Sequence, residues 1–164
     1  MTAPRVHLSF VAALLLALGA ESLPLLAQPA SRPEDVLLGG WRLDLASSRY
    51  SPGPPVRTES RTYTRDSQGV LGVIERVHAD GRTERIEYRP ETDQQVPVSG
   101  ARSYDAIRLK RVDSRTTEGI LSHAGRVFGY SRRTISADGR TMTITFRREE
   151  PGDMVNNIAV YRKQ

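Results

Sequence analysis

The chain has 164 residues, a net charge of +5 and a pI near 10.0. A chain of this length is expected to form one domain with a modest hydrophobic core. It contains no cysteine, which excludes disulfide bonds and attachment of a lipid to a cysteine.

The N-terminal residues have the pattern of a signal peptide. Residues 1–7 carry Arg5 and no acidic side chain, and residues 8–20 form an apolar run that is short for a membrane span. We therefore expect a signal peptide over residues 1–27 and a flexible leader over residues 28–36.

An export signal without cysteine predicts a bacterial protein of the periplasm or the extracellular space, because small exported eukaryotic domains usually carry disulfide bonds. No second long apolar segment follows, so we expect no transmembrane segment in the mature chain. Export also argues against nucleic acid as a partner, and no basic cluster with interleaved stacking aromatics stands out.

The remaining sequence predicts short β-strands separated by turns. Residues 51–55 contain three prolines, which exclude a helix there and favour an extended loop. No segment after the signal peptide has a helical period with caps. Many short strands at this spacing predict an all-β fold. The expected strands span residues 37–45, 57–65, 70–79, 82–89, 96–98, 104–112, 115–122, 126–135, 140–146 and 155–162.

The pentapeptide Ala-Asp-Gly-Arg-Thr occurs twice between β-prone runs, at residues 79–83 and 137–141. Asp-Gly in this context is a strong hairpin signal. In the first hairpin, a three-residue loop places Glu75 opposite Arg85, whereas a two-residue loop would place two arginines opposite each other. We therefore predict a three-residue loop, and an antiparallel up-and-down meander of about eight to ten strands.

The same loop in the second hairpin would pair Tyr130 with Phe146 and Arg132 with Ile144. A slip of one residue would instead turn Arg133 inward. A type II turn at residues 150–153 would add strand 155–162 to the same face. This face is apolar with a few polar groups, as in ligand pockets. Its predicted members are Glu118, Ile120, Phe128, Tyr130, Arg132, Met142, Ile144, Phe146, Asn157 and Tyr161.

Two short motifs resemble those of the calycins, the lipocalins and fatty-acid-binding proteins. Residues 39–41, Gly-Gly-Trp, fit the Gly-x-Trp motif of the first lipocalin strand, and residues 159–164 are similar to the Arg-x-Tyr ending of fatty-acid-binding proteins. Tyr161 matches that ending, but Ala159 stands at the arginine position. Residues 47–56 are too short and proline-rich for a helical lid. The resemblance implies a single lipocalin-like β-barrel domain over residues 37–164 more than it implies fatty-acid binding.

The shared face and the resemblance together predict a site for a small apolar or amphipathic ligand, including an anionic one. Arg132, Tyr130 and Tyr161 would orient its polar head. Alternatively, Arg132 pairs with Glu118 and the tyrosines bond to backbone. Trp41 is expected to plug the closed end of the barrel. The residues predicted to bury the apolar body are Phe128, Ile144 and Phe146.

No cofactor, metal site or catalytic residue is predicted. His78 and His123 lie at hairpin turns without a carboxylate cluster, and no Gly-x-Ser-x-Gly motif is present. Glu118 near Tyr130 and Arg132 is a candidate general base, whereas Glu149 and Glu150 are expected to be a solvated loop pair. The first hypothesis is therefore a periplasmic or secreted lipocalin-like carrier. The second is a non-catalytic envelope interaction or stress-related barrel that has no small-molecule ligand.

Overall fold

In the computed structural model, which describes residues 33–150 and 153–164, the chain is almost entirely β-sheet. Two short 3₁₀-helices, η1 (Pro33–Leu37) and η2 (Leu45–Ser47), flank the first strand. Within the described ranges, no helix is long and apolar enough to cross a membrane. The ten strands are β1 (Gly39–Leu43), β2 (Thr58–Asp66), β3 (Gly69–Val77), β4 (Thr83–Tyr88), β5 (Gln95–Ser99), β6 (Ala106–Arg111), β7 (Thr116–His123), β8 (Arg126–Ile135), β9 (Thr141–Glu150) and β10 (Asp153–Lys163).

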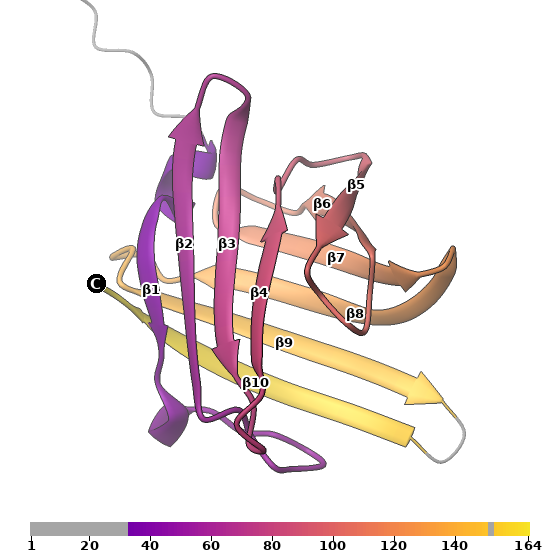
Figure 1. Ribbon diagram of the computed structural model, residues 1–164. Helices are drawn as coiled ribbons and strands as arrows, with labels where there is room; N and C mark the ends of the chain where they lie inside the picture. Colours follow the sequence, from indigo (N-terminus) through magenta and orange to yellow (C-terminus); the bar gives the residue numbers. More distant parts are fainter. Residues whose placement is uncertain (1–32, 151–152) are drawn as a thin grey trace, which may run out of the picture. The chain divides into compact units, whose positions relative to one another are not determined.

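The ten strands form a closed antiparallel barrel. Each strand pairs with its neighbours in the chain, and β1 also pairs with β10, where Arg42 lies opposite Arg162 (Figure 1). Closure leaves no free sheet edge. The predicted all-β meander of about eight to ten strands is therefore confirmed.

An apolar cluster fills the end of the barrel where the chain enters. Trp41 is 1% exposed, and its indole N–H donates a hydrogen bond to the Leu37 carbonyl oxygen at 2.8 Å. Trp41 is thus buried in the apolar cluster, as expected of a plug residue. The buried members of this cluster are Leu37, Trp41, Tyr63, Val70, Ile135, Met142, Ala159 and Tyr161.

The 3₁₀-helix η1 lies next to the first strand and contacts the barrel. Residues 33–36, which the sequence assigns to a flexible leader, belong to η1. Val36 packs against the apolar cluster, and the Asp35 carboxylate pairs with Arg65 at 2.6 Å. The predicted signal peptide, residues 1–27, lies outside the described residues.

A strap of irregular chain, residues 48–57, crosses the other end of the barrel. It follows η2 and is held along β10, where the Arg49 N–H donates to the Ile158 carbonyl oxygen at 2.8 Å. The Ser51 N–H donates to Asn157 Oδ1 at 3.1 Å. This strap contains no helix between η2 and β2, as its prolines predict, because their fixed φ angles and missing N–H groups disfavour one.

The two hairpins with the repeated pentapeptide have different loops. In the first, Glu75 lies opposite Arg85, which confirms the three-residue loop. In the second, Arg132 lies opposite Thr145 and Arg133 lies opposite Ile144. The second loop therefore has four residues, 137–140, and the predicted three-residue loop is wrong there.

The residue before the repeat explains this difference. The Ser136 hydroxyl oxygen accepts a hydrogen bond from the Thr141 N–H at 2.9 Å, an interaction that His78 does not make at the equivalent position. The Arg140 carbonyl oxygen accepts instead from the Lys163 N–H on β10 at 3.0 Å. A side-chain hydroxyl and a neighbouring strand thus favour the longer loop.

The longer loop exchanges the two faces of β8, because a slip of one residue reverses every side chain. Arg132 and Tyr130 point outward, and Tyr130 is 53% exposed. Ser131 and Arg133 face the interior. The predicted inward orientation of Arg132 and Tyr130 is therefore wrong, whereas the alternative with Arg133 inside describes the structure.

Phe128 remains on the inner side because β8 contains a β-bulge. Leu121 pairs with Gly129, but Ser122 pairs with Val127, so Phe128 is an extra residue in the ladder. Regular alternation would place Phe128 on the same outward face as Tyr130. The bulge instead directs its ring into the barrel.

The last hairpin has the predicted register. Asn157 lies opposite Phe146, Ala159 opposite Ile144 and Tyr161 opposite Met142. These side chains share the inner face, as expected from a tight connection between Glu150 and Asp153. Residues 151–152, which would form that turn, lie outside the described residues.

Candidate functional site

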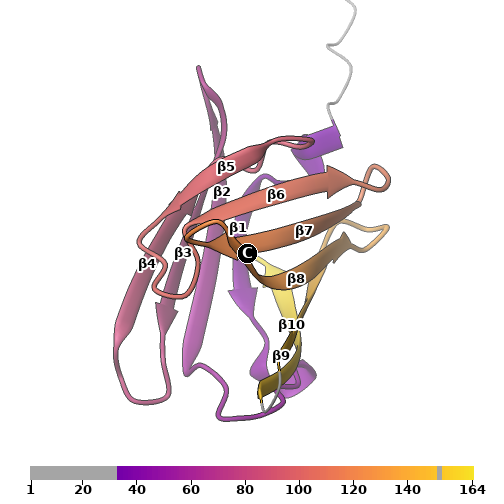
Figure 2. The same ribbon diagram turned by 90° about the vertical axis from the view of Figure 1, so that its right-hand side faces the viewer.

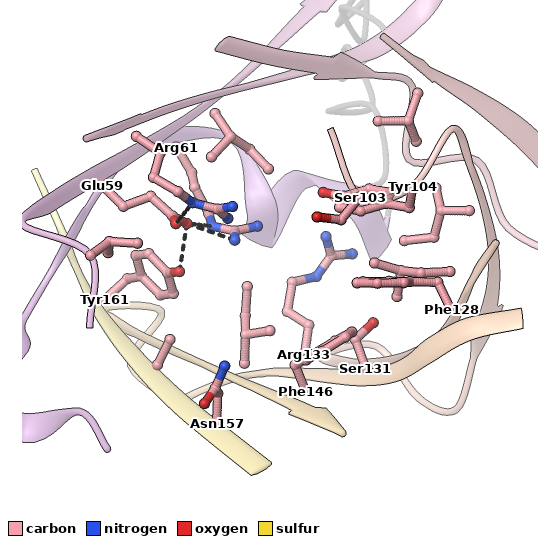
Figure 3. Close-up of a pocket in the computed structure, with 18 of the residues that line it drawn as sticks. Glu59, Arg61, Ser103, Tyr104, Phe128, Ser131, Arg133, Phe146, Asn157 and Tyr161 are labelled. Carbon is pink, nitrogen blue, oxygen red and sulfur yellow. Dashed lines mark hydrogen bonds and ion pairs between the residues drawn. The ribbon is translucent and has the colours of Figure 1, made fainter. Parts of the chain in front are cut away.

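A cavity of about 330 Å³ lies inside the barrel, toward the end that the strap crosses. Tyr50, Pro52, Pro54 and Val56 of the strap form part of its wall, while the Trp41 plug does not line it. This volume is at the lower end of the range for small-molecule sites. Figure 3 shows the polar and aromatic side chains that project into it.

One wall of the cavity is aromatic. The rings of Phe128 and Phe146 lie with centroids 5.8 Å apart, and Tyr104 stacks on Phe128 at 6.3 Å. Gly129 makes room for this arrangement, because a Cβ atom there would lie 2.6 Å from the Phe146 ring. The aliphatic residues that complete the apolar lining are Ile74, Val98, Ile107, Leu109, Leu121, Ile144 and Ala159.

The opposite wall contains a buried carboxylate, Glu59. Strand alternation on β2 turns Glu59, Arg61 and Tyr63 inward. The Glu59 carboxylate pairs with Arg61 at 2.7 Å and with Arg76 of β3 at 2.6 Å. The Tyr161 hydroxyl donates to it at 2.6 Å. These three partners hold the carboxylate between β2, β3 and β10 (Figure 3).

The Glu59 cluster fixes the charge state of its carboxylate. Burial alone would raise the pKa of Glu59, but the guanidinium groups of Arg61 and Arg76 and the Tyr161 hydrogen bond outweigh burial and lower the pKa to about 2. Glu59 is thus ionised near neutral pH and is a poor general base. It functions as an internal counter-ion for two arginines.

Arg76 contacts a second buried carboxylate behind the cavity wall. Its Nη1 lies 3.1 Å from Glu84, which also accepts a hydrogen bond from the Arg102 N–H at 2.9 Å. His78 Nε2 lies 3.2 Å from Glu84 Oε2, the oxygen that Arg76 contacts. The positive charges of Arg61 and Arg76 are therefore balanced by Glu59 and Glu84.

Arg133 has no such balance. Its Nη2 donates to the Thr117 hydroxyl at 3.0 Å, and its guanidinium lies 5.9 Å from the Tyr63 ring centroid. No carboxylate lies within ion-pair distance of Arg133 in the part of the chain that the structure describes. Figure 3 shows this guanidinium between the Glu59 cluster and the wall formed by Ser103, Tyr104 and Phe128. The cavity therefore contains one uncompensated positive charge.

Two tyrosine hydroxyls add hydrogen-bond donors. Burial, followed by the charge of Glu59, raises the pKa of Tyr50 to about 12. Burial also raises the pKa of Tyr104. Both phenols are therefore protonated near neutral pH, and neither hydroxyl has a hydrogen-bond partner within the described ranges. Arg133 and these hydroxyls can bind an anionic or strongly polar group.

Four of the six predicted ligand contacts line the cavity: Tyr161, Phe128, Ile144 and Phe146. Tyr161 bonds to Glu59, not to backbone, so its hydroxyl proton is already donated. Arg132 and Tyr130 are outside, for the reason given by the second hairpin loop. Arg132 pairs with Glu118 at 2.6 Å, as the alternative interpretation held, and both side chains are about half exposed.

The sequence did not identify Glu59, Arg61 or Arg76 as site residues. A signal was present, since Glu59, Arg61 and Tyr63 alternate along one strand. The turn at Ser67-Gln68 then sets Glu59 opposite Arg76. Contact with Tyr161 could not be read in this way, because it joins β2 to β10, which lie on either side of β1 and are far apart in the sequence.

No group of three or more histidine and carboxylate side chains that could hold a metal ion is found among the residues described. No model of a known protein family matches the chain. No curated protein sequence matches it significantly either. The fold and the cavity are therefore the basis for a functional assignment.

Proposed function

We propose that the protein is a lipocalin-like carrier, periplasmic or secreted, that binds a small amphipathic molecule carrying one anionic group. The observation that carries this proposal is Arg133, a cavity arginine without a carboxylate partner among the residues that the structure describes. The ligand's anion would occupy the space in front of this guanidinium. Its apolar body would lie against Phe128, Phe146 and Ile144.

The cavity arginines favour a ligand with one anionic group. Arg61 and Arg76 already bind Glu59, and displacing that carboxylate would leave its charge buried and unpaired. Arg133 has no competing anion. A guanidinium binds a carboxylate or sulfonate through charge-assisted hydrogen bonds, which are stronger than neutral ones. The hydroxyls of Tyr50 and Tyr104 are additional donors.

The apolar wall would supply most of the binding free energy. Burial of apolar surface contributes about 25 cal/mol per Å² removed from water. A flat or compact hydrophobic group fits aromatic rings and a cavity of about 330 Å³. Arg133 would then select an anionic molecule over a neutral molecule of the same shape.

The test uses two probes of similar shape, the anionic fluorophore anilinonaphthalene sulfonate and neutral phenylnaphthylamine. We expect both to bind. Arg133→Gln should weaken the sulfonate about tenfold or more, which corresponds to the loss of a charged hydrogen bond, and should leave the neutral probe nearly unchanged. Arg132→Gln is the matched control, because the adjacent arginine points outward, and it should change neither affinity.

Failure of the wild-type protein to bind either probe would contradict the carrier proposal. An equal loss of both probes in Arg133→Gln would instead assign a structural role to Arg133. Native mass spectrometry of the protein purified from its own cells gives an independent check, since a co-purifying small molecule is expected to be an organic anion.

A further inference from the structure

The outer face of β6, β7, β8 and β9 carries a row of side chains that belongs to no site described so far. Arg108 lies opposite Ile120, Ile120 opposite Tyr130, and Tyr130 opposite Arg147. Neighbouring strands are about 4.8 Å apart, so these side chains adjoin one another. Ile120 is 40% exposed and Tyr130 is 53% exposed. An apolar centre is thus flanked by an arginine on each side.

Further cations surround this row. Lys110 of β6 lies one position along its strand face from Arg108, and Arg126 lies beside Val127, which is 51% exposed. Within the described ranges, Arg108, Lys110, Arg126 and Arg147 have no ion-pair partner. Among the described side chains of β6–β9, the one acidic group is Glu118, and it is paired with Arg132. We call these residues of β6–β9 the basic outer face.

The opposite outer side of the barrel is different. On β3 and β4, Arg85 pairs with Glu75 at 2.8 Å and with Glu87 at 2.9 Å. Arg82 at the adjoining turn pairs with Asp80. Charge is therefore balanced there and in excess on the basic outer face. Figure 2 shows β6, β7 and β8 side by side, apart from β3 and β4.

We propose that the basic outer face docks on an anionic phospholipid bilayer. Exposed apolar side chains interleaved with arginines match such a surface, because the cations attract lipid phosphates while the apolar groups enter the interface. Tyrosine is suited to this depth, since its ring is apolar and its hydroxyl remains hydrated.

This proposal does not depend on ligand binding in the cavity. Arg133, Phe128 and the Glu59 cluster line the interior, whereas the row of Arg108, Ile120, Tyr130 and Arg147 is exposed on the outside of the barrel. If the cavity binds no small molecule, the protein can still dock through this surface. The two proposals therefore have separate tests.

The test measures partition of the full chain onto vesicles of phosphatidylglycerol mixed with phosphatidylcholine, relative to vesicles of phosphatidylcholine alone. Dividing the two partition coefficients removes the contribution to membrane binding of the apolar residues 8–20, which all variants share. Each cation near an anionic surface contributes about fivefold to partition, so Arg108→Ser with Arg147→Ser should lower the ratio about 25-fold. Tyr130→Ser should weaken binding to the anionic vesicles several-fold. Higher salt should weaken the wild type.

The matched control is Arg82→Ser with Arg85→Ser, which removes the same charge from the balanced side and should leave the ratio nearly unchanged. Equal binding to both kinds of vesicle would overturn the proposal. So would an equal fall in the ratio for both double variants, because net charge alone would then explain the binding. Self-association or capture of an acidic protein through this face, without vesicle binding, would assign a different partner and would also overturn it.

Discussion

Replacement of Glu59 by glutamine tests whether the buried cluster stabilises the barrel through the carboxylate charge. Glu59→Gln keeps the size of the side chain but leaves Arg61 and Arg76 without their shared counter-ion. Glu59 is 4% exposed, so solvent screens the interaction little. Removal of one partner from a buried ion pair typically costs about 3–5 kcal/mol.

The lowered pKa of Glu59 gives an independent value for this loss of folding free energy. A fall from 4.5 to about 2 on folding corresponds to about 3 kcal/mol at neutral pH. The folded-state pKa lies below the unfolded one, so this stability is fully present above pH 4.5. It is lost as the pH falls from 4.5 to about 2, where the folded protein also binds the proton.

Urea unfolding followed by circular dichroism measures the effect at neutral pH and at several acidic pH values. We expect the wild type to exceed Glu59→Gln by about 3 kcal/mol at neutral pH, with the difference shrinking toward pH 2. Glu118→Gln is the control, because its pair with Arg132 is exposed and should contribute at most about 1 kcal/mol. A difference below 1 kcal/mol for Glu59→Gln, or one that persists unchanged in acid, would refute the reasoning.

Two further substitutions test the packing and the second hairpin. Gly129→Ala would bring a Cβ atom to 2.6 Å from the Phe146 ring and 2.9 Å from the Arg147 carbonyl oxygen. We expect a loss of about 1–3 kcal/mol by urea unfolding, against a small effect for Gly40→Ala, where the nearest atom is 3.6 Å away. Ser136→Ala removes the acceptor of the Thr141 N–H. It should lower stability by about 0.5–1.5 kcal/mol and accelerate amide hydrogen exchange at Thr141, and unchanged exchange would exclude the proposed role of the hydroxyl.

Local sequence signals were sufficient where the structure depends on neighbouring residues in the chain. The first Ala-Asp-Gly loop was predicted correctly because opposed charges, Glu75 with Arg85, are compatible with one register only. The register of the last hairpin followed from a tight connection between Glu150 and Asp153. The inward positions of Ile144, Phe146 and Tyr161 were therefore found without the structure.

The same reasoning placed Arg132 inside because it treated two identical pentapeptides as equivalent. The second loop also depends on the Ser136 hydroxyl and on the Lys163 N–H of β10, which is distant in the sequence. A single added loop residue reversed β8 and replaced Arg132 by Arg133. The bulge at Phe128 then returned this ring to the predicted inner side. No periodic pattern could have predicted the bulge.

The sequence by itself determined an all-β meander, most of its strands and the aromatic character of one wall, because strand alternation and turn chemistry act over a few residues. Only the tertiary structure decided which arginine is available to a ligand. Closure of the barrel brings Glu59 and Arg61 of β2, Arg76 of β3 and Tyr161 of β10 together, so that two arginines are neutralised. Arg133 remains uncompensated because charge balance is a property of contacts between distant strands, and a buried charge is strongly stabilised only by the partners that lie next to it.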